Sequence, residues 1–313
     1  MNTELADGTV YASAWRRLGA FMADVFLLGL VGIIAGYFLF DMLVDLGGWG
    51  RALGFLVALA YFATLNSRIG NGQTLGKRLL HVKVVGADGA PLPFSRAALR
   101  FAVLGIAWFI NGAWFSAGVL ESAWIYPLEV AVFGVGLSVA YLFLFNRPTR
   151  QSLHDLAVSS YVVRSESQAP LAAAPLRHVH VVIVTLLMVA AAAAPYFVGR
   201  LVGKEPFAAL LVVYRTIGAE PEVLHAEVNK GWSATSGGKS TYLHVVAYLS
   251  EPNVDDAAKA ARLAKLSLEK DPSAMQVDVL QVTLIYGYDI GIASAQRSQS
   301  YAHAPAEWIA AKN

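Results

Sequence analysis

The sequence predicts an α-helical integral membrane bundle of four core spans plus a fifth, followed by a small C-terminal α+β extracytoplasmic domain. Three observations lead to this fold class. The 313-residue chain is 56% hydrophobic and 15% charged, with a mean hydropathy of +0.51, whereas a typical soluble domain carries about 25% charged residues. Five stretches are long and apolar enough to approach the roughly 20 residues that cross a bilayer. After residue 204, apolar and polar residues alternate as they do in strands.

The first expected span, residues 18–40, contains one charged residue, Asp24. Its apolar stretch is too long for the core of a signal peptide, and no small-residue cleavage site follows it, so we expect a retained membrane anchor. The other expected spans are residues 51–65, 97–115, 124–145 and 179–201. Pro195 is expected to mark the far end of the last span or a kink in it.

Basic residues are concentrated in alternate loops, and the side of the membrane that holds them is the cytoplasmic side. Arg16 and Arg17 precede the first span. The loop between spans two and three, and the one between spans four and five, hold Arg68, Lys77, Arg78, Lys83, Arg96, Arg100, Arg147, Arg150, Arg164 and Arg177. The pattern predicts a cytoplasmic N-terminus and a C-terminal domain outside the cell membrane.

The expected organisation has four parts. They are a four-helix transmembrane domain (1–164), a cytoplasmic linker (165–178), a fifth transmembrane helix (179–203) and an extracytoplasmic domain (204–313). In the last part, residues 224–232 and 241–249 alternate as strands around the turn-rich "SATSGGKS". Residues 253–272 have helix start and stop signals, and residues 277–285 form a third strand. The predicted domain is therefore β-β-α-β.

Several kinds of chemistry are excluded or disfavoured. The absence of cysteine rules out disulfides and thiolate sites. The stretch "GNGQTLGKRLL" is not a phosphate loop, because Asn71 and Arg78 stand where the motif needs glycine and Ser or Thr. His178 and His180 are two residues apart and lie on different sides of a helix, which disfavours a metal site. We therefore expect no enzyme activity, no metal, no cofactor and no nucleic-acid partner.

Asp24 is the main candidate functional residue. It lies seven residues after Arg17, which places both on one helix face about 10 Å apart along the axis. An acid within a membrane is costly, and such residues usually face the bundle interior and pair with a partner. One interpretation is a proton or cation site. The other is an ion pair between helices that fixes their packing.

Other candidates accompany Asp24. Asp155 follows a basic segment and, near Arg16 or Arg17, would complete a charge network at the inner mouth of the bundle. His154 is a candidate for gating near neutral pH, and Glu129 is a candidate release site.

Lys77 and Arg78 are expected to face anionic lipid. Gly32 and Gly36 fit the small-residue spacing of packed membrane helices. Tyr286, Tyr288 and Asp289 either line a partner surface or pack at a strand end.

Three stretches together resemble the RDD family of bacterial inner-membrane proteins: "AWRRLGAFMAD", "NGQTLGKRLLHVKVVGADGAPLPFSRAALR" and "RPTRQSLHDLAVSSYVV". The resemblance covers about residues 12–164. It implies that the named residues of the family fall on Arg17 (with Arg16 as the alternative), Asp24 and Asp155. It also implies a bacterial inner-membrane location and, from the exchange proposed for one member, antiport of Na⁺, K⁺ or Li⁺ against protons.

Two functions follow as hypotheses. The first is a cation/proton transporter, working as a homo-oligomer, that uses Asp24 as its proton or cation group. The second is a non-transporting membrane scaffold, adaptor or envelope sensor whose outer domain binds a protein partner. The environment of Asp24 separates them, because transport requires access from water, whereas a scaffold is satisfied by a closed, fully paired cluster.

Overall fold

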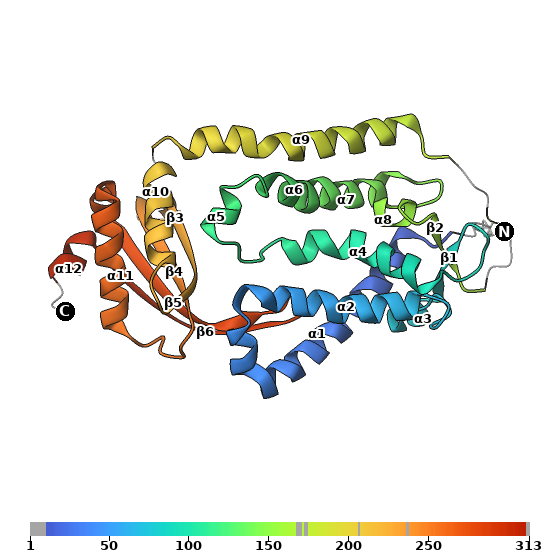
Figure 1. Cartoon of the computed structure of the whole chain (residues 1–313), viewed down its shortest axis with the longest axis horizontal. Coiled ribbons are helices and arrows are strands. Elements are labelled where there is room, and N and C mark those ends of the chain that lie inside the picture. The colour runs from blue at the N-terminus through green and yellow to red at the C-terminus, as the bar shows by residue number, and fades with distance from the viewer. Residues whose placement is uncertain (1–10, 167–170, 172–174, 206, 236–237, 311–313) are drawn as a thin grey trace.

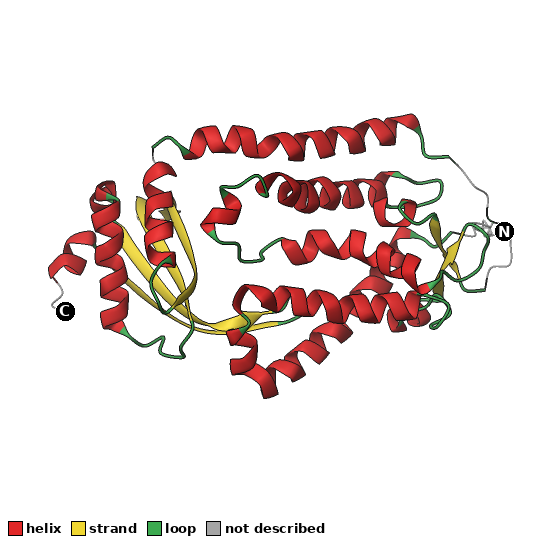
Figure 2. Cartoon of the chain, in the orientation of Figure 1, coloured by secondary structure: helices red, strands yellow, loops and turns green. Residues whose placement is uncertain are grey.

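The computed structural model describes residues 11–166, 171, 175–205, 207–235 and 238–310. Helices fill most of the molecule, a four-stranded sheet with its own helices lies at one end, and a two-stranded sheet lies at the other (Figures 1 and 2). We call the first of these the outer end, with the C-terminal domain as the outer domain, and the second the inner end, as names for their places in the molecule. The expected cytoplasmic linker, 165–178, and the loop between the first two outer strands fall partly outside the described residues.

The helices of the bundle and its inner face are α1 (Ala14–Asp45), α2 (Gly50–Asn66), α3 (Leu75–Leu79), α4 (Phe94–Ile110), α5 (Ala117–Leu120), α6 (Ile125–Glu129), α7 (Gly136–Phe145), α8 (Leu153–Leu156) and α9 (His178–Val202), with a π-helical turn, Val130–Val135, joining α6 to α7. The outer helices are α10 (Phe207–Gly218), α11 (Ala257–Lys270) and α12 (Pro305–Ala310). The strands are β1 (Val82–Gly86), β2 (Ser160–Arg164), β3 (Val223–Thr235), β4 (Gly238–Leu249), β5 (Val279–Asp289) and β6 (Ser294–His303).

Four helices in the described part of the chain are long and apolar enough to cross a membrane: Ala14–Asp45, Gly47–Asn66, Ile125–Phe145 and His178–Leu201. They correspond to four of the five expected spans. The expected third span is α4, which has 17 residues and ends at Ile110 instead of reaching residue 115. The helix stops because Asn111 has an extended backbone and Gly112 has a positive φ of 82°.

The long helices run side by side, and both ends of the bundle carry additional structure. The helix α9 packs along α6, the π-helical turn and α7 (Figure 1). At the inner end, β1 pairs with β2 in antiparallel register, from Val82 opposite Arg164 to Gly86 opposite Ser160. Because β1 follows α3 and β2 follows α8, this pairing fixes the two short helices that carry Lys77 and Asp155 relative to each other.

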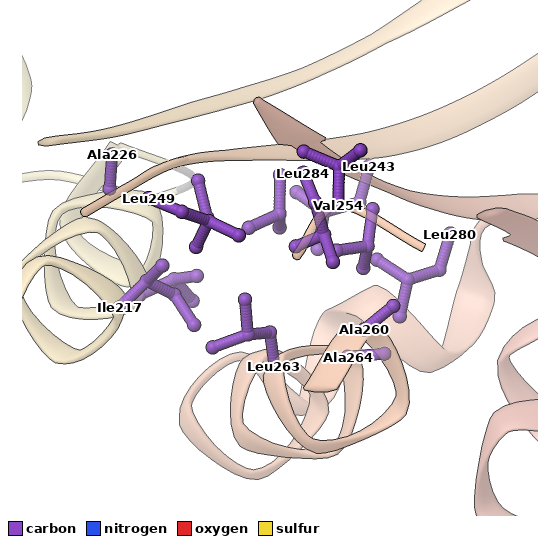
Figure 3. Close-up of a cluster of buried hydrophobic side chains, with 14 of the residues drawn as sticks. Ile217, Ala226, Leu243, Leu249, Val254, Ala260, Leu263, Ala264, Leu280 and Leu284 are labelled. Carbon is purple, nitrogen blue, oxygen red and sulfur yellow. The ribbon is translucent and has the colours of Figure 1, made fainter. Parts of the chain in front are cut away.

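The outer domain is a four-stranded sheet in the order β3-β4-β5-β6. The predicted strands and helix are present, and α11 crosses over between the parallel pair β4 and β5. Apolar side chains of the sheet and of α10 and α11 form its core, including Ile217, Leu243, Leu249, Leu263, Leu280 and Leu284 (Figure 3). The domain also contains α10, α12 and a fourth strand, β6, none of which was predicted. β6 has exposed side chains at nine of its ten positions, so it lacks the apolar alternation that reveals a strand.

Candidate functional site

Asp24 lies inside the first span and is completely buried. Its carboxylate accepts three hydrogen bonds: from the Tyr61 hydroxyl at 2.7 Å, from the Thr74 hydroxyl at 2.5 Å and from the backbone N–H of Gly76 at 2.8 Å. These donors come from α2 and from the start of α3. Asp24 therefore ties three elements together without an ion pair to an arginine.

The local sequence explains why α3 reaches Asp24. Thr74 is the N-cap of α3, and its hydroxyl accepts a hydrogen bond from the N–H of Lys77. A side chain at Gly76 would place a Cβ 2.1 Å from the carbonyl oxygen of Ala20 on α1. Only glycine lets the backbone of α3 approach α1 closely enough to bond the carboxylate.

Asp155 is the centre of a second buried network. Its carboxylate is paired with Arg17 at 2.5 Å and with Arg100 at 2.6 Å. The N–H of Ser152 also donates to it, in a capping box that begins α8. Burial opposes ionisation, but His154, Arg100 and Arg17 hold the pKa of Asp155 below its ordinary value. Asp155 is therefore a permanent anion between two arginines.

This arrangement differs in detail from the one expected. Arg17 pairs with Asp155 and also donates to the carbonyl oxygen of Arg150. Asp24, on the same helix, has its own separate donors. Arg16, the alternative to Arg17, is exposed and takes no part in the network. Arg100 was missed as a site residue because it lies near the start of α4, six residues after Phe94, and its position resembles that of any basic residue that flanks a span.

The remaining candidates also have definite places. His154 is buried with its Nε2 3.6 Å from Asp155, and burial lowers its pKa to about 3, so the ring is neutral at neutral pH, contrary to the gating hypothesis. Lys77 points into the bundle instead of facing lipid, whereas Arg78 is exposed. Glu129 lies in the span Ile125–Phe145, and within the described chain no hydrogen bond or ion pair joins it to these groups.

We call the buried polar set at the inner end the inner cluster: Arg17, Asp24, Lys77, Arg100, His154 and Asp155. Beside it lies a cavity of about 250 Å³, the inner cavity, which is lined by Arg17, Lys77, Arg100, His154 and Asn66 together with apolar side chains. An apolar groove of about 430 Å³ adjoins it. Asp24 lines neither space.

The β5–β6 turn occupies the outer half of the bundle. The hairpin tip, residues 289–293, lies against α1 and α2, and Figure 1 shows β5 and β6 reaching from the sheet toward these helices. Glycines make the room: an added Cβ would lie 1.7 Å from the Ile290 carbonyl oxygen at Gly54 and 2.6 Å from the Ala293 Cβ at Gly32. The expected helix-packing glycines therefore accommodate a hairpin.

Polar bonds at the rim fasten the same contact. Arg51 on α2 pairs with Asp289 at 2.7 Å, and the Trp108 indole N–H donates to the Gly291 carbonyl at 2.9 Å. The Tyr286 hydroxyl donates to Asp41 at 2.7 Å. The aromatic and acidic residues at the end of β5 thus have a partner surface, and it is the bundle of their own chain.

Fold and site together define a membrane protein: apolar helices enclose a buried charged cluster, and an α+β domain is attached to them. Residues 11–159 match the model of the RDD family, which confirms the resemblance carried by the three sequence stretches. The match contains Arg17, Asp24, Arg100 and Asp155 and ends before α9 and the outer domain. No curated protein and no solved structure matches the chain.

Proposed function

We propose that this protein is a non-transporting adaptor of the bacterial inner membrane, in which an extracytoplasmic domain that binds a protein partner is held rigidly on a closed helical bundle. The observation that carries the proposal is the state of Asp24. Its carboxylate is fully buried, accepts three internal hydrogen bonds and lines neither the inner cavity nor the groove.

A cation/proton exchanger requires the opposite environment. Its carboxylate must exchange a proton for a cation, and therefore needs a water-filled route and oxygen ligands arranged around an open space. Asp24 is instead surrounded by donors, from Tyr61, Thr74 and Gly76, which satisfy an anion and leave no place for a cation. The charged side chains that line the inner cavity, Arg17, Lys77 and Arg100, are all cationic, which also opposes cation passage.

The hairpin tip supports the adaptor role. If only a linker joined the outer domain to the bundle, the two would be expected to move relative to each other. Here the tip is packed against α1, α2 and α4, with Ile290 buried, and the Arg51–Asp289 pair reinforces the contact. Such a connection holds the outer sheet at a fixed distance and orientation above the bundle.

The first test is ion flux in proteoliposomes. Purified full-length protein is given pulses of sodium, potassium or lithium across a pH gradient, beside Asp24→Asn. We expect no cation-dependent proton movement from either protein. Flux from the parent that disappears in a folded Asp24→Asn protein would restore the antiporter hypothesis.

A second experiment tests the adaptor role directly. A photo-crosslinking residue is placed in living cells at Gln299, which is exposed on the edge strand β6. Edge strands offer unpaired backbone groups for pairing with another chain. We expect one discrete adduct from Gln299 and none from the matched position Glu269, exposed on α11. Equal labelling from both positions would contradict a specific partner surface.

A further inference from the structure

The inner cavity and the groove adjoin each other, and together they offer a charged end and an apolar end. Six residues line both of them: Phe21, Phe62, Phe101, Leu104, Gly136 and Val139. Their volumes, about 250 and 430 Å³, together fall within the range of about 300–1,000 Å³ that is typical of ligand pockets. A ligand that fits this space has a polar head and a long apolar part.

No acidic side chain lines the charged end, although Asp155 lies behind its arginines. Three cationic side chains, Arg17, Lys77 and Arg100, line the inner cavity, and Asp155 pairs with the two arginines. Lys77 is only 9% exposed, and its Nζ donates one long hydrogen bond, to the Thr74 hydroxyl at 3.4 Å, but in the described chain no carboxylate lies within 4.0 Å of Nζ. A buried ammonium without a counterion is costly, and an anionic ligand would remove that cost.

Two further buried side chains beside Lys77 have polar atoms without a partner. The Oδ1 of Asn66 and the Nδ1 of His154 make no hydrogen bond within the part of the chain that the structure describes. Both residues are more than nine-tenths buried and line the inner cavity. Unpaired buried polar atoms are uncommon in native proteins and point to an unseen ligand or water.

The apolar end opens toward the lipid-facing side of the bundle. The groove runs between α1 and the segment formed by the π-helical turn and α7, and Met22, Phe133 and Leu137 line it while remaining about half exposed, at 48%, 50% and 50%. An acyl chain can therefore enter from the side. Basic pockets between membrane helices at the cytoplasmic side are places where anionic lipid headgroups bind.

We propose that this space binds one anionic phospholipid, with its phosphate held by Lys77, Arg100 and Arg17 and an acyl chain lying in the groove. The inference does not depend on the adaptor proposal. It does connect with the hairpin tip, because Gly291 and Ile292 form part of the groove wall. The bound chain thus contacts the outer domain as well as the bundle.

The test measures lipid retention by the purified full-length protein in mild detergent. Phosphatidylglycerol is titrated and the bound fraction is read by native mass spectrometry, with phosphatidylcholine and inorganic phosphate as separate arms. We expect one phosphatidylglycerol bound with high affinity. Lys77→Gln should weaken it about tenfold or more, because a charge-assisted contact to the phosphate is lost. Arg78→Gln, which removes the neighbouring exposed charge, should leave affinity unchanged.

The groove is tested independently of the charge. An added Cβ at Gly136 meets only the Ala107 Cβ, at 3.5 Å, which is an ordinary contact. Gly136→Leu therefore fills the passage between head and tail sites, and should reduce phosphatidylglycerol binding while the protein stays folded. If Lys77→Gln fails to fold, Lys77→Arg keeps the charge and should bind normally.

A pH titration adds a readout that a purely structural lysine would not give. Burial and the charge of Arg100 lower the pKa of Lys77 to about 7, and a bound phosphate raises it again. Binding should therefore weaken as pH rises through 7 and above, and Lys77→Arg should remove that dependence. The groups that surround Lys77 are Arg17 and Asp24 on α1, Tyr61 on α2, Arg100 on α4, and His154 and Asp155 on α8.

Three results would overturn the proposal. Equal binding of phosphatidylglycerol by the parent and by Lys77→Gln would remove the headgroup site. Equal retention of phosphatidylcholine would reduce the effect to bulk lipid. Inorganic phosphate that competes as strongly as the lipid would assign the cavity to a free anion. None of these outcomes bears on the flux of cations, so the proposal and the adaptor function fail separately.

Discussion

The inner cluster and the hairpin contact hold the two ends of the bundle by different means. At the inner end, Arg17, Arg100 and Asp155 come from α1, α4 and α8 and meet through short, buried ion pairs. At the outer end, the hairpin tip is seated against glycines of α1 and α2, and its ion pair lies at the rim. One contact depends on matched charges and the other on the absence of side chains.

The difference teaches where each contact is vulnerable. A buried ion pair adds little net stability compared with apolar packing. Removing one partner, however, leaves the other charge buried without a counterion, which strongly destabilises the fold. A glycine contact has no such charge, and it is disturbed only when atoms are added. Deletion should therefore damage the inner cluster most, whereas enlargement should damage the hairpin contact.

The largest expected effect follows from neutralising Asp155. Asp155→Asn leaves Arg17 and Arg100 buried with no counterion, so we expect a loss of about 3–5 kcal/mol in unfolding free energy. Denaturant unfolding in detergent micelles measures it. Asp255→Asn, at an exposed position, is the matched control and should change stability by less than about 0.5 kcal/mol. A small loss for Asp155→Asn would mean that the inner cluster is hydrated and not a closed network.

The second effect is a loss of folding stability at acidic pH that arises from the buried His154. The folded-state pKa of His154 is about 3, whereas an unfolded histidine has a pKa of about 6.5. Between these values only the unfolded state binds the proton, so stability falls as pH decreases below about 6.5, by up to about 1.4 kcal/mol per pH unit. His154→Gln should unfold with a weaker dependence on pH between 6.5 and 4. Identical pH profiles would show that the folded-state pKa of His154 lies close to its unfolded value.

The third effect follows from adding a side chain at the hairpin contact. Gly54→Ala places a Cβ 1.7 Å from the backbone oxygen of Ile290, so the hairpin tip must move, at a cost of about 1–3 kcal/mol. We expect faster proteolytic release of the outer domain while the inner cluster stays intact. Gly199→Ala on α9 is the control, because nothing lies within 4 Å of its added Cβ. Equal release from both variants would argue against a seated hairpin.

The sequence predicted the parts of this molecule that have a simple pattern of apolar residues. Four of the apolar spans were recognised from their length and hydropathy, and the strands β3, β4 and β5 from the alternation of apolar and polar residues along the sequence. Asp24 stood out as the one charge in its apolar span, Arg17 as a basic residue on the same helix face, and Asp155 as an acid after a basic segment, and the family resemblance carried all three. Arg100 did not, because it lies in the first two turns of its helix, where basic residues commonly flank a membrane span.

The hairpin contact was beyond sequence reasoning for two physical reasons. The strand β6, "SAQRSQSYAH", is polar throughout, since most of its side chains are exposed. Glycines spaced along a membrane helix, such as Gly32 and Gly36, allow any backbone to approach, and helix packing is the more common use of that pattern. Only the fold reveals that they face Ala293 and Tyr288.

The smallest effect comes from the ion pair between Arg51 and Asp289 at the rim, and measuring it tests whether charge or shape holds the hairpin contact. Arg51 and Asp289 are 17% and 36% exposed, so solvent screens their attraction, and a double-mutant cycle should give a coupling of about 0.2–1 kcal/mol. The cycle uses Arg51→Gln, Asp289→Asn and the double variant, with unfolding free energy as the readout. It is needed because Arg51 also donates to the carbonyls of Trp108 and Asn111, and the cycle removes those separate contributions. A coupling as large as the loss in Asp155→Asn would mean that the hairpin contact, like the inner cluster, is held by charge. A coupling within the expected range would leave shape as the cause of its stability.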